Sequence, residues 1–410
     1  MYVRLEDDSG FAHAVVVRTA YFVEQMAGGR KLIHRTLGRF LRMEAVSGVL
    51  LLIAAAAGVS LANSSYSDVY FARLESPIPL GGVRFWINDG LMTLFFLVVG
   101  LEIGRERESG VLRHPRQALL PVAAACGGVI VPALIYLSAN SLPALHSGWA
   151  VPTATDIAFA VGILGLLGPR IPGPLRTFVL TLAVIDDVIA VVIIALFYSH
   201  DLRYAAVAVA AAAFVLMFVL RRAAIGAALP YIFAGALLWL SLYRAGIHPA
   251  LAGVVIGLAL PRAAADRFEG LLHPISAYLV MPLFAFANAG IRLGGFNPEN
   301  SAEVSVAAGV AVALIVGKPV GVIGTTLLLV RTKAGRLAGE INWSGVTLIG
   351  LLAGIGFTMS IFVALLAFES APLLAAGKLG VLIGSVTAAV LSLCWGAFYL
   401  QRATRTSCAP

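Results

Sequence analysis

Apolar stretches of about 20 residues recur along the chain, separated by short segments with charged residues, proline, glycine or asparagine. A helix of that length crosses a hydrocarbon layer of about 30 Å. The pattern predicts about twelve spans and therefore an all-α, polytopic membrane bundle. The expected spans lie near 43–62, 86–104, 117–138, 149–168, 175–199, 203–220, 229–243, 247–260, 274–290, 303–330, 343–368 and 376–400.

These spans form one predicted transmembrane domain at 36–402, with a cytoplasmic extension at 1–35 and a cytoplasmic tail at 403–410. The N-terminus does not fit a cleaved signal peptide, because Glu6, Asp7 and Asp8 lie where such peptides carry positive charge. In the longest outer loop, 63–84, the 66–73 stretch and the following Pro77-Ile78-Pro79 and Gly81-Gly82 indicate a short hairpin.

Basic residues are unevenly distributed between the two sides of this topology. With the N-terminus inside, 22 of the 29 Lys and Arg residues fall in inner segments, six fall in outer loops, and Lys318 lies deep in a span. Cytoplasmic loops of membrane proteins are enriched in Lys and Arg. We therefore predict a multi-pass membrane protein with both termini in the cytoplasm.

The composition supports the membrane class and argues against others. The chain is 60% hydrophobic and 12% charged, about half the charge of a soluble domain. Its net charge of +8 comes from short loop clusters, without the aromatic-interleaved basic stripe of nucleic-acid binders. Cys126, Cys394 and Cys408 are too scattered for a disulfide framework or a metal site. We expect no nucleic acid partner, no organic cofactor and no enzymatic activity.

Four ionisable residues lie well inside predicted spans: Asp156, Asp186, Asp187 and Lys318. Such groups are costly in a membrane and mark functional sites by default, although structural ion pairs between helices are the alternative. Asp186 and Asp187 are adjacent in one helix and point about 100° apart, so one can meet Asp156 while the other faces a third helix. Lys318 can pair with Asp186 or balance half-helix carbonyl ends, and a purely structural role is also open.

Buried carboxylates that share a low-dielectric site cannot all ionise, so they are neutralised by protons or by a cation. Competition between the two is itself an exchange mechanism, because a cation binds only when protons leave. Carboxylate, hydroxyl and carbonyl oxygens suit a hard cation such as Na+ or Li+.

Two predicted spans carry helix-breaking residues near their middle. Pro152, Thr153 and Thr155 precede Asp156 in the fourth span, and Gly354 and Gly356 lie in the eleventh. Close helix packing is the alternative explanation of the glycines. The two spans occupy matching places in the two ends of the chain, which is typical of an inverted-repeat transporter with its site where they cross.

Several ordered motifs from about residue 36 to 400 resemble the NhaA family of sodium/proton antiporters. They are Phe85-Trp86-Ile87-Asn88-Asp89, Gly100-Leu101-Glu102, Thr155-Asp156-Ile157-Ala158-Phe159, Ile185-Asp186-Asp187, Pro282-Leu283-Phe284-Ala285-Phe286-Ala287-Asn288, Gly317-Lys318-Pro319 and Gly354-Ile355-Gly356-Phe357-Thr358. The resemblance implies an electrogenic, pH-regulated exchanger of the bacterial inner membrane, and a homodimer formed through loop 63–84.

The resemblance also implies roles for individual residues. Asp187 and Asp156 would be the principal ion-site carboxylates, with Thr155 beside them. Asp186 would alternate between Lys318 and the ion site, and Asp156 and Lys318 would compensate the ends of the half-helices.

Residues implied in pH regulation are Glu102, His248, Glu269 and His273. The chain departs from the family pattern at Gly270, where a His is expected, and in about 34 extra N-terminal residues. The Gly270 departure bears on the pH threshold, and a packed, hydrogen-bonded role is equally open for His248.

Two other classes of protein fit less well. An intramembrane aspartyl protease needs aspartates on facing helices in a Gly-x-Gly-Asp context, which the Asp186-Asp187 pair does not provide. A Na+-coupled organic-anion symporter of the same fold would need a further polar pocket, which the sequence does not indicate.

Overall fold

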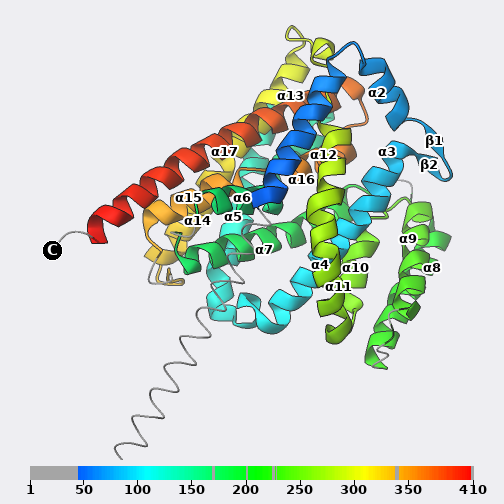
Figure 1. The fold of residues 1–410 in the computed structure, drawn as a ribbon, viewed down its shortest axis with the longest axis horizontal. Helices are drawn as coiled ribbons and strands as arrows, with labels where there is room; N and C mark the ends of the chain where they lie inside the picture. The colour runs from blue at the N-terminus through cyan, green and yellow to red at the C-terminus, as the bar shows by residue number, and fades with distance from the viewer. Residues whose placement is uncertain are drawn as a thin grey trace, which may run out of the picture.

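The computed structural model describes residues 45–168, 171–199, 202–223, 227, 229–337 and 341–407, with side chains to 401. The predicted extension at 1–35 lies outside the described residues. The described chain is an all-α bundle apart from one two-stranded hairpin (Figure 1).

Among the described residues, eight helices are long and apolar enough to cross a membrane. They are Ala45–Ala62; Val83–Ser109, made of α3 (Val83–Phe85), η1 (Trp86–Leu91) and α4 (Met92–Ser109); α5 (Pro115–Ala139); α7 (Gly173–Phe197); α8 (Tyr204–Arg222); Arg262–Ala289, made of α11 (Arg262–Ile275), η4 (Ser276–Val280) and α12 (Met281–Ala289); Ser301–Arg331, made of α13 (Ser301–Val312), η6 (Ala313–Gly317) and α14 (Lys318–Arg331); and the Ala371–Gln401 part of α17 (Ala371–Ser407).

Two further spans are each broken into two helices, as the sequence predicted. The fourth consists of η3 (Pro143–Thr153) and α6 (Ile157–Leu166), which meet at 42°, and the eleventh of α15 (Trp343–Ala353) and α16 (Phe357–Ala367), which meet at 43°. The count therefore reaches ten by length and composition. The predicted twelve is not confirmed, because α9 (Leu229–Ala245) and α10 (Leu251–Ala259) are shorter than the spans.

Loop 63–84 is only partly the predicted hairpin. Strands β1 (Pro77–Ile78) and β2 (Gly81–Gly82) pair antiparallel, but the preceding residues form helix α2 (Ser67–Leu74). Tyr70 and Leu74 lie four residues apart, so helical geometry places both on the buried face. The Tyr70 hydroxyl also donates to the Phe286 carbonyl oxygen at 2.6 Å, which anchors α2 to α12. Two short 3-10 turns, η2 (Val111–Arg113) and η5 (Leu293–Gly295), complete the described elements.

Helices α5 and α14 approach so closely that only glycine fits between them. A Cβ at Gly321 would lie 2.1 Å from the Gly127 carbonyl oxygen, and a Cβ at Gly127 would lie 2.6 Å from the Gly321 carbonyl oxygen. Small residues permit this contact between membrane helices. The contact lies one turn after Lys318, the first residue of α14. It therefore holds the start of α14, and with it the Lys318 side chain, in position.

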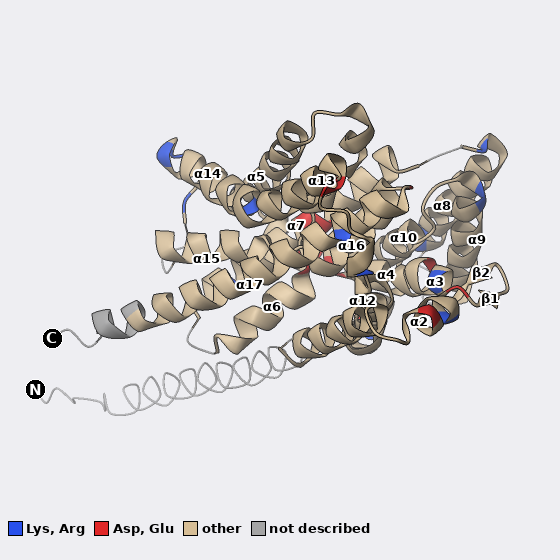
Figure 2. Ribbon diagram, turned by 90° about the horizontal axis from the view of Figure 1, so that it is seen from above, with Lys and Arg blue, Asp and Glu red and all other residues tan. Residues whose placement is uncertain are grey.

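Most charged residues lie toward the ends of the helices, but a small acidic and basic group lies deep among them near α7 (Figure 2). Asp156, Asp186, Asp187 and Lys318 are all buried. The four residues that the sequence placed inside the membrane are therefore also inside the protein.

Candidate functional site

The breaks of the two interrupted spans lie against each other. The Asp156 amide donates to the Ile355 carbonyl oxygen at 2.7 Å, joining the backbones of the two breaks. A Cβ at Gly356 would lie 3.0 Å from the Ala154 carbonyl oxygen, and one at Gly354 would lie 2.6 Å from that of Leu314. Both glycines therefore permit close backbone approach as well as a helix break.

The Asp156 carboxylate binds the first turns of two different helices. It caps α6 by accepting from the Phe159 amide at 3.0 Å. Its other oxygen accepts from the Thr358 amide at 3.0 Å, in the first turn of α16, and from the Thr358 hydroxyl. A negative group is favoured at a helix N-terminus because the unpaired amides there carry partial positive charge. Asp156 therefore lies where its negative charge can compensate the starts of both half-helices.

Two other hydroxyls satisfy backbone groups at the break in the eleventh span. The Ser385 hydroxyl of α17 accepts from the Phe357 amide at 2.9 Å. The Thr155 hydroxyl lies 2.9 Å from the Ala353 carbonyl oxygen at the end of α15. Both contacts involve backbone groups that an interrupted helix leaves without internal partners.

Lys318 and Asp186 form a fully buried ion pair. Thr155 supports the pair, because its hydroxyl accepts from Lys318 Nζ at 2.8 Å and contacts the same Asp186 oxygen. The other oxygen of Asp186, Oδ1, is buried and has no hydrogen-bond partner among the described residues. Of the two pairings open to Lys318 from the sequence, the structure has the one with Asp186.

Asp187 lies in a different environment from its neighbour. It lines a cavity of about 190 Å³ between α4, α6, α7 and the α11–α12 span, together with Glu102, Arg105, Glu106 and His273. Its side chain is buried, and Oδ2 has no hydrogen-bond partner among the described residues. No hydrogen bond in the described part of the chain joins Asp187 to Asp156.

Three of the four residues implied in pH regulation line an adjoining surface opening, which shares Glu102, Arg105 and His273 with this cavity. His273 Nε2 lies 3.8 Å from Glu102 Oε1, and Glu269 forms an ion pair with Arg105. Gly270 lines the same opening, and a Cβ there would meet nothing within 4 Å. The absence of the expected His therefore leaves open space at this point.

The fourth residue, His248, lies in a separate contact. Its Nε2 is 3.4 Å from Asp89 Oδ1, and its ring packs edge-on against Phe362, with centroids 4.9 Å apart. Phe362 also contacts Phe96 and Phe284. His248 is thus both packed and paired with a carboxylate.

Sequence reasoning assigned no role to Thr358, Ser385 or Arg105. Thr358 was noted only as part of a glycine-rich motif, although hydroxyl residues beside a helix break are a recognisable sign of backbone satisfaction. Ser385 and Arg105 carry no such local sign, because their partners lie on other helices.

The fold and the site together define a class of protein. Two interrupted membrane helices cross near the middle of a bundle, their breaks are joined by a carboxylate, and a buried Asp–Lys pair lies beside them. This is the architecture of a secondary active transporter with its site at the crossing of two repeats.

The chain belongs to the family described as Na+/H+ antiporter 1, whose profile matches residues 38–395. It is 50% identical to the Na+/H+ antiporter NhaA of Acidovorax sp., over 90% of this chain and 93% of that protein. It is 48% identical to the NhaA of Bordetella petrii (90% and 91% covered) and 45% identical to NhaA 2 of Pseudomonas putida (93% and 97%).

Proposed function

We propose that this chain exchanges Na+ or Li+ for H+ across a bacterial inner membrane, electrogenically and under control of pH. The observation that carries the proposal is Asp187, a buried carboxylate that lines a cavity and has one oxygen without a hydrogen-bond partner among the described residues. Beside it, Asp186 is held by the only Lys or Arg deep inside a predicted span. Family membership supports the same activity.

In the proposed cycle a cation reaches Asp187 through the cavity and displaces a proton from it. Asp186 then leaves Lys318 and turns its free oxygen toward the ion, with Thr155 as a hydroxyl ligand. Asp156 completes the site when one of its bonds to α16 opens. When Asp186 leaves it, Lys318 gives up a second proton on the side from which the cation enters. On the other side one proton rebinds to Asp187 and one to Lys318, Asp186 returns to Lys318, and the cation leaves. More than one proton therefore moves per cation, which makes the cycle electrogenic.

The opening that is lined by Glu102, Glu269 and His273 is the proposed site of pH regulation. Ionised carboxylates there attract a cation, whereas protonation removes that attraction. We place this opening on the cytoplasmic side, with both termini, because the inner segments carry most of the Lys and Arg residues.

The test is Na+-induced proton release in everted membrane vesicles, across about pH 6.5 to 9. Wild-type protein should collapse a preformed pH gradient when Na+ or Li+ is added, and Asp187→Asn should not. Asp68→Asn is the matched control, because Asp68 is exposed on α2 and should leave transport unchanged. A membrane potential that increases the wild-type rate would support net charge movement.

Loss of the response in Asp187→Asn alone supports carboxylate-centred exchange. If wild-type vesicles respond to neither cation, the proposal is wrong, and Na+-dependent uptake of an organic anion becomes the next measurement.

A further inference from the structure

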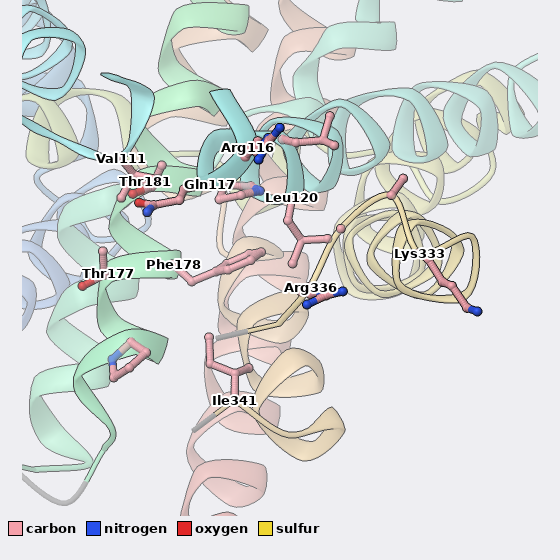
Figure 3. A pocket seen from close by; sticks show the side chains of 15 residues that line it. Val111, Arg116, Gln117, Leu120, Thr177, Phe178, Thr181, Lys333, Arg336 and Ile341 are labelled. Carbon is pink, nitrogen blue, oxygen red and sulfur yellow. The ribbon is translucent and has the colours of Figure 1, made fainter. Parts of the chain in front are cut away.

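A second cavity, of about 1040 Å³, lies beside the N-terminal half of α7. Neither Lys318 nor Asp186 lines it. It is bounded by the first turns of α5 and α7, the turn that follows α14, and the residues that precede α15. Figure 3 shows Arg116 and Gln117 on one side and Arg336 across the opening, with Lys333 farther out on the turn and its side chain directed outward.

The charge of this cavity is entirely positive among the described residues that line it. Arg116, Lys333 and Arg336 contribute three cations, and no Asp or Glu is present in that lining. None of the three forms an ion pair with another residue that the structure describes. Gln117 and Thr177 add neutral groups that can donate hydrogen bonds. The lining is therefore complementary to an anion with several oxygen acceptors.

The remaining wall of the cavity is apolar. Leu120, Phe178 and Ile341 are buried in it, whereas Leu119 is 41% exposed on the outside of α5. Leu328, which lies outside the lining and one turn before the end of α14, is 61% exposed. In a membrane bundle such exposed leucines face acyl chains. A cationic cavity with a lipid-facing apolar edge suits a molecule that has an anionic head and a hydrocarbon tail.

We infer that this cavity binds the headgroup of an anionic phospholipid. The phosphate would lie between Arg116 and Arg336, Lys333 would contribute at the rim, and the acyl chains would lie along Leu119 and Leu328. Basic pockets between membrane helices bind anionic lipid headgroups in this way. The inference does not depend on which ion the chain transports.

The lipid would lie against the helix that carries both central carboxylates. Thr177 and Thr181 line this cavity and also the one that leads to Asp187. Bound lipid would therefore stabilise the first turns of α7 and reduce local unfolding of the segments that line the cavity.

Hydrogen–deuterium exchange of the full chain in neutral detergent tests the inference, with phosphatidylglycerol or phosphatidylcholine added. Phosphatidylglycerol should slow exchange in 111–119 and 331–337, and phosphatidylcholine should not. In the triple variant Arg116→Gln, Lys333→Gln, Arg336→Gln the affinity should fall about a hundredfold, at about fivefold for each cation removed. Gln117→Glu, which adds one negative charge without changing shape, should weaken the same protection.

The control is the triple variant Arg73→Gln, Arg203→Gln, Arg244→Gln, which removes three exposed cations from the opposite end of the bundle. It should keep the protection. Equal protection by phosphatidylcholine, or full protection in the first triple variant, would overturn the inference. Inorganic phosphate that protects the same segments without lipid would also overturn it, because the cavity would then be a site for a soluble anion.

Discussion

Lys318 and Asp186 are buried side chains from different helices, and each is the other's only charged partner among the described ion pairs. Removing one member of a buried pair leaves an uncompensated charge, which costs about 3–5 kcal/mol. Removing both replaces the pair by neutral groups and avoids most of that cost.

We therefore expect Lys318→Met and Asp186→Asn each to lower the thermal stability of the purified protein clearly. The double variant should be more stable than the sum of the two losses implies, by about 1–3 kcal/mol. Thermal unfolding in detergent measures this coupling. Strictly additive losses would show that the two side chains do not stabilise each other.

At Gly270 the chain offers space for a residue that the family pattern would place there. We expect Gly270→His to change stability by less than about 0.5 kcal/mol, because the site is open and on the surface. A His with an ordinary pKa of about 6.5 is positive below that pH, so below it the side chain should repel cations at the opening that Gly270 lines. The ratio of Na+-driven exchange at alkaline to mildly acidic pH should rise.

Gly270→Gln is the control for this substitution, since it adds a side chain of similar length that does not titrate. An identical pH profile for the two variants would contradict a role of charge at this position.

At the scale of elements, the contact between α5 and α14 sets where Lys318 lies. Gly321→Ala should force the two helices apart, because its Cβ would overlap the Gly127 carbonyl oxygen. Overpacking of this kind costs about 1–3 kcal/mol, and it should also weaken exchange by displacing Lys318. Thermal unfolding and vesicle transport measure the two effects.

Gly324→Ala on the same helix is a matched control, since its Cβ meets nothing within 4 Å. It should be neutral or stabilising by up to about 1 kcal/mol, because alanine favours helix. If the two variants behave alike, close packing at Gly321 does not position α14.

The interrupted spans could be predicted from sequence because Pro152, Gly354 and Gly356 are local signals. Helix α2 could not be predicted, because alternation of apolar and polar residues in a short loop does not distinguish a strand from a helix. The helical form depends on the hydrogen bond from Tyr70 to Phe286, which is distant in the sequence. Within the site, the charged residues were predictable because charge is rare in spans. Thr358 was not, since its partner Asp156 lies 202 residues away in the chain.

At the scale of the whole molecule, the hairpin of β1 and β2 is the proposed dimer contact. Ile78 and Leu80 are exposed on it, and a two-stranded hairpin leaves unpaired backbone groups at both edges. Replacing residues 77–82 by a Gly-Ser linker should convert a homodimer into a monomer, while each subunit keeps its own ion site. Light scattering in detergent measures the mass, and vesicle assays measure residual exchange. A dimer that survives the replacement would place the interface elsewhere.

The bond between Asp156 and Thr358 also has a consequence for biosynthesis. A ribosome that adds about 5–20 residues per second needs roughly 10–40 s to make the intervening 202 residues. During that time Asp156 can cap α6 only, and the carboxylate oxygen that later binds α16 must find water, a proton or another temporary donor. The proposed ion site is therefore assembled among the last parts of the newly made protein, after the eleventh span has entered the membrane.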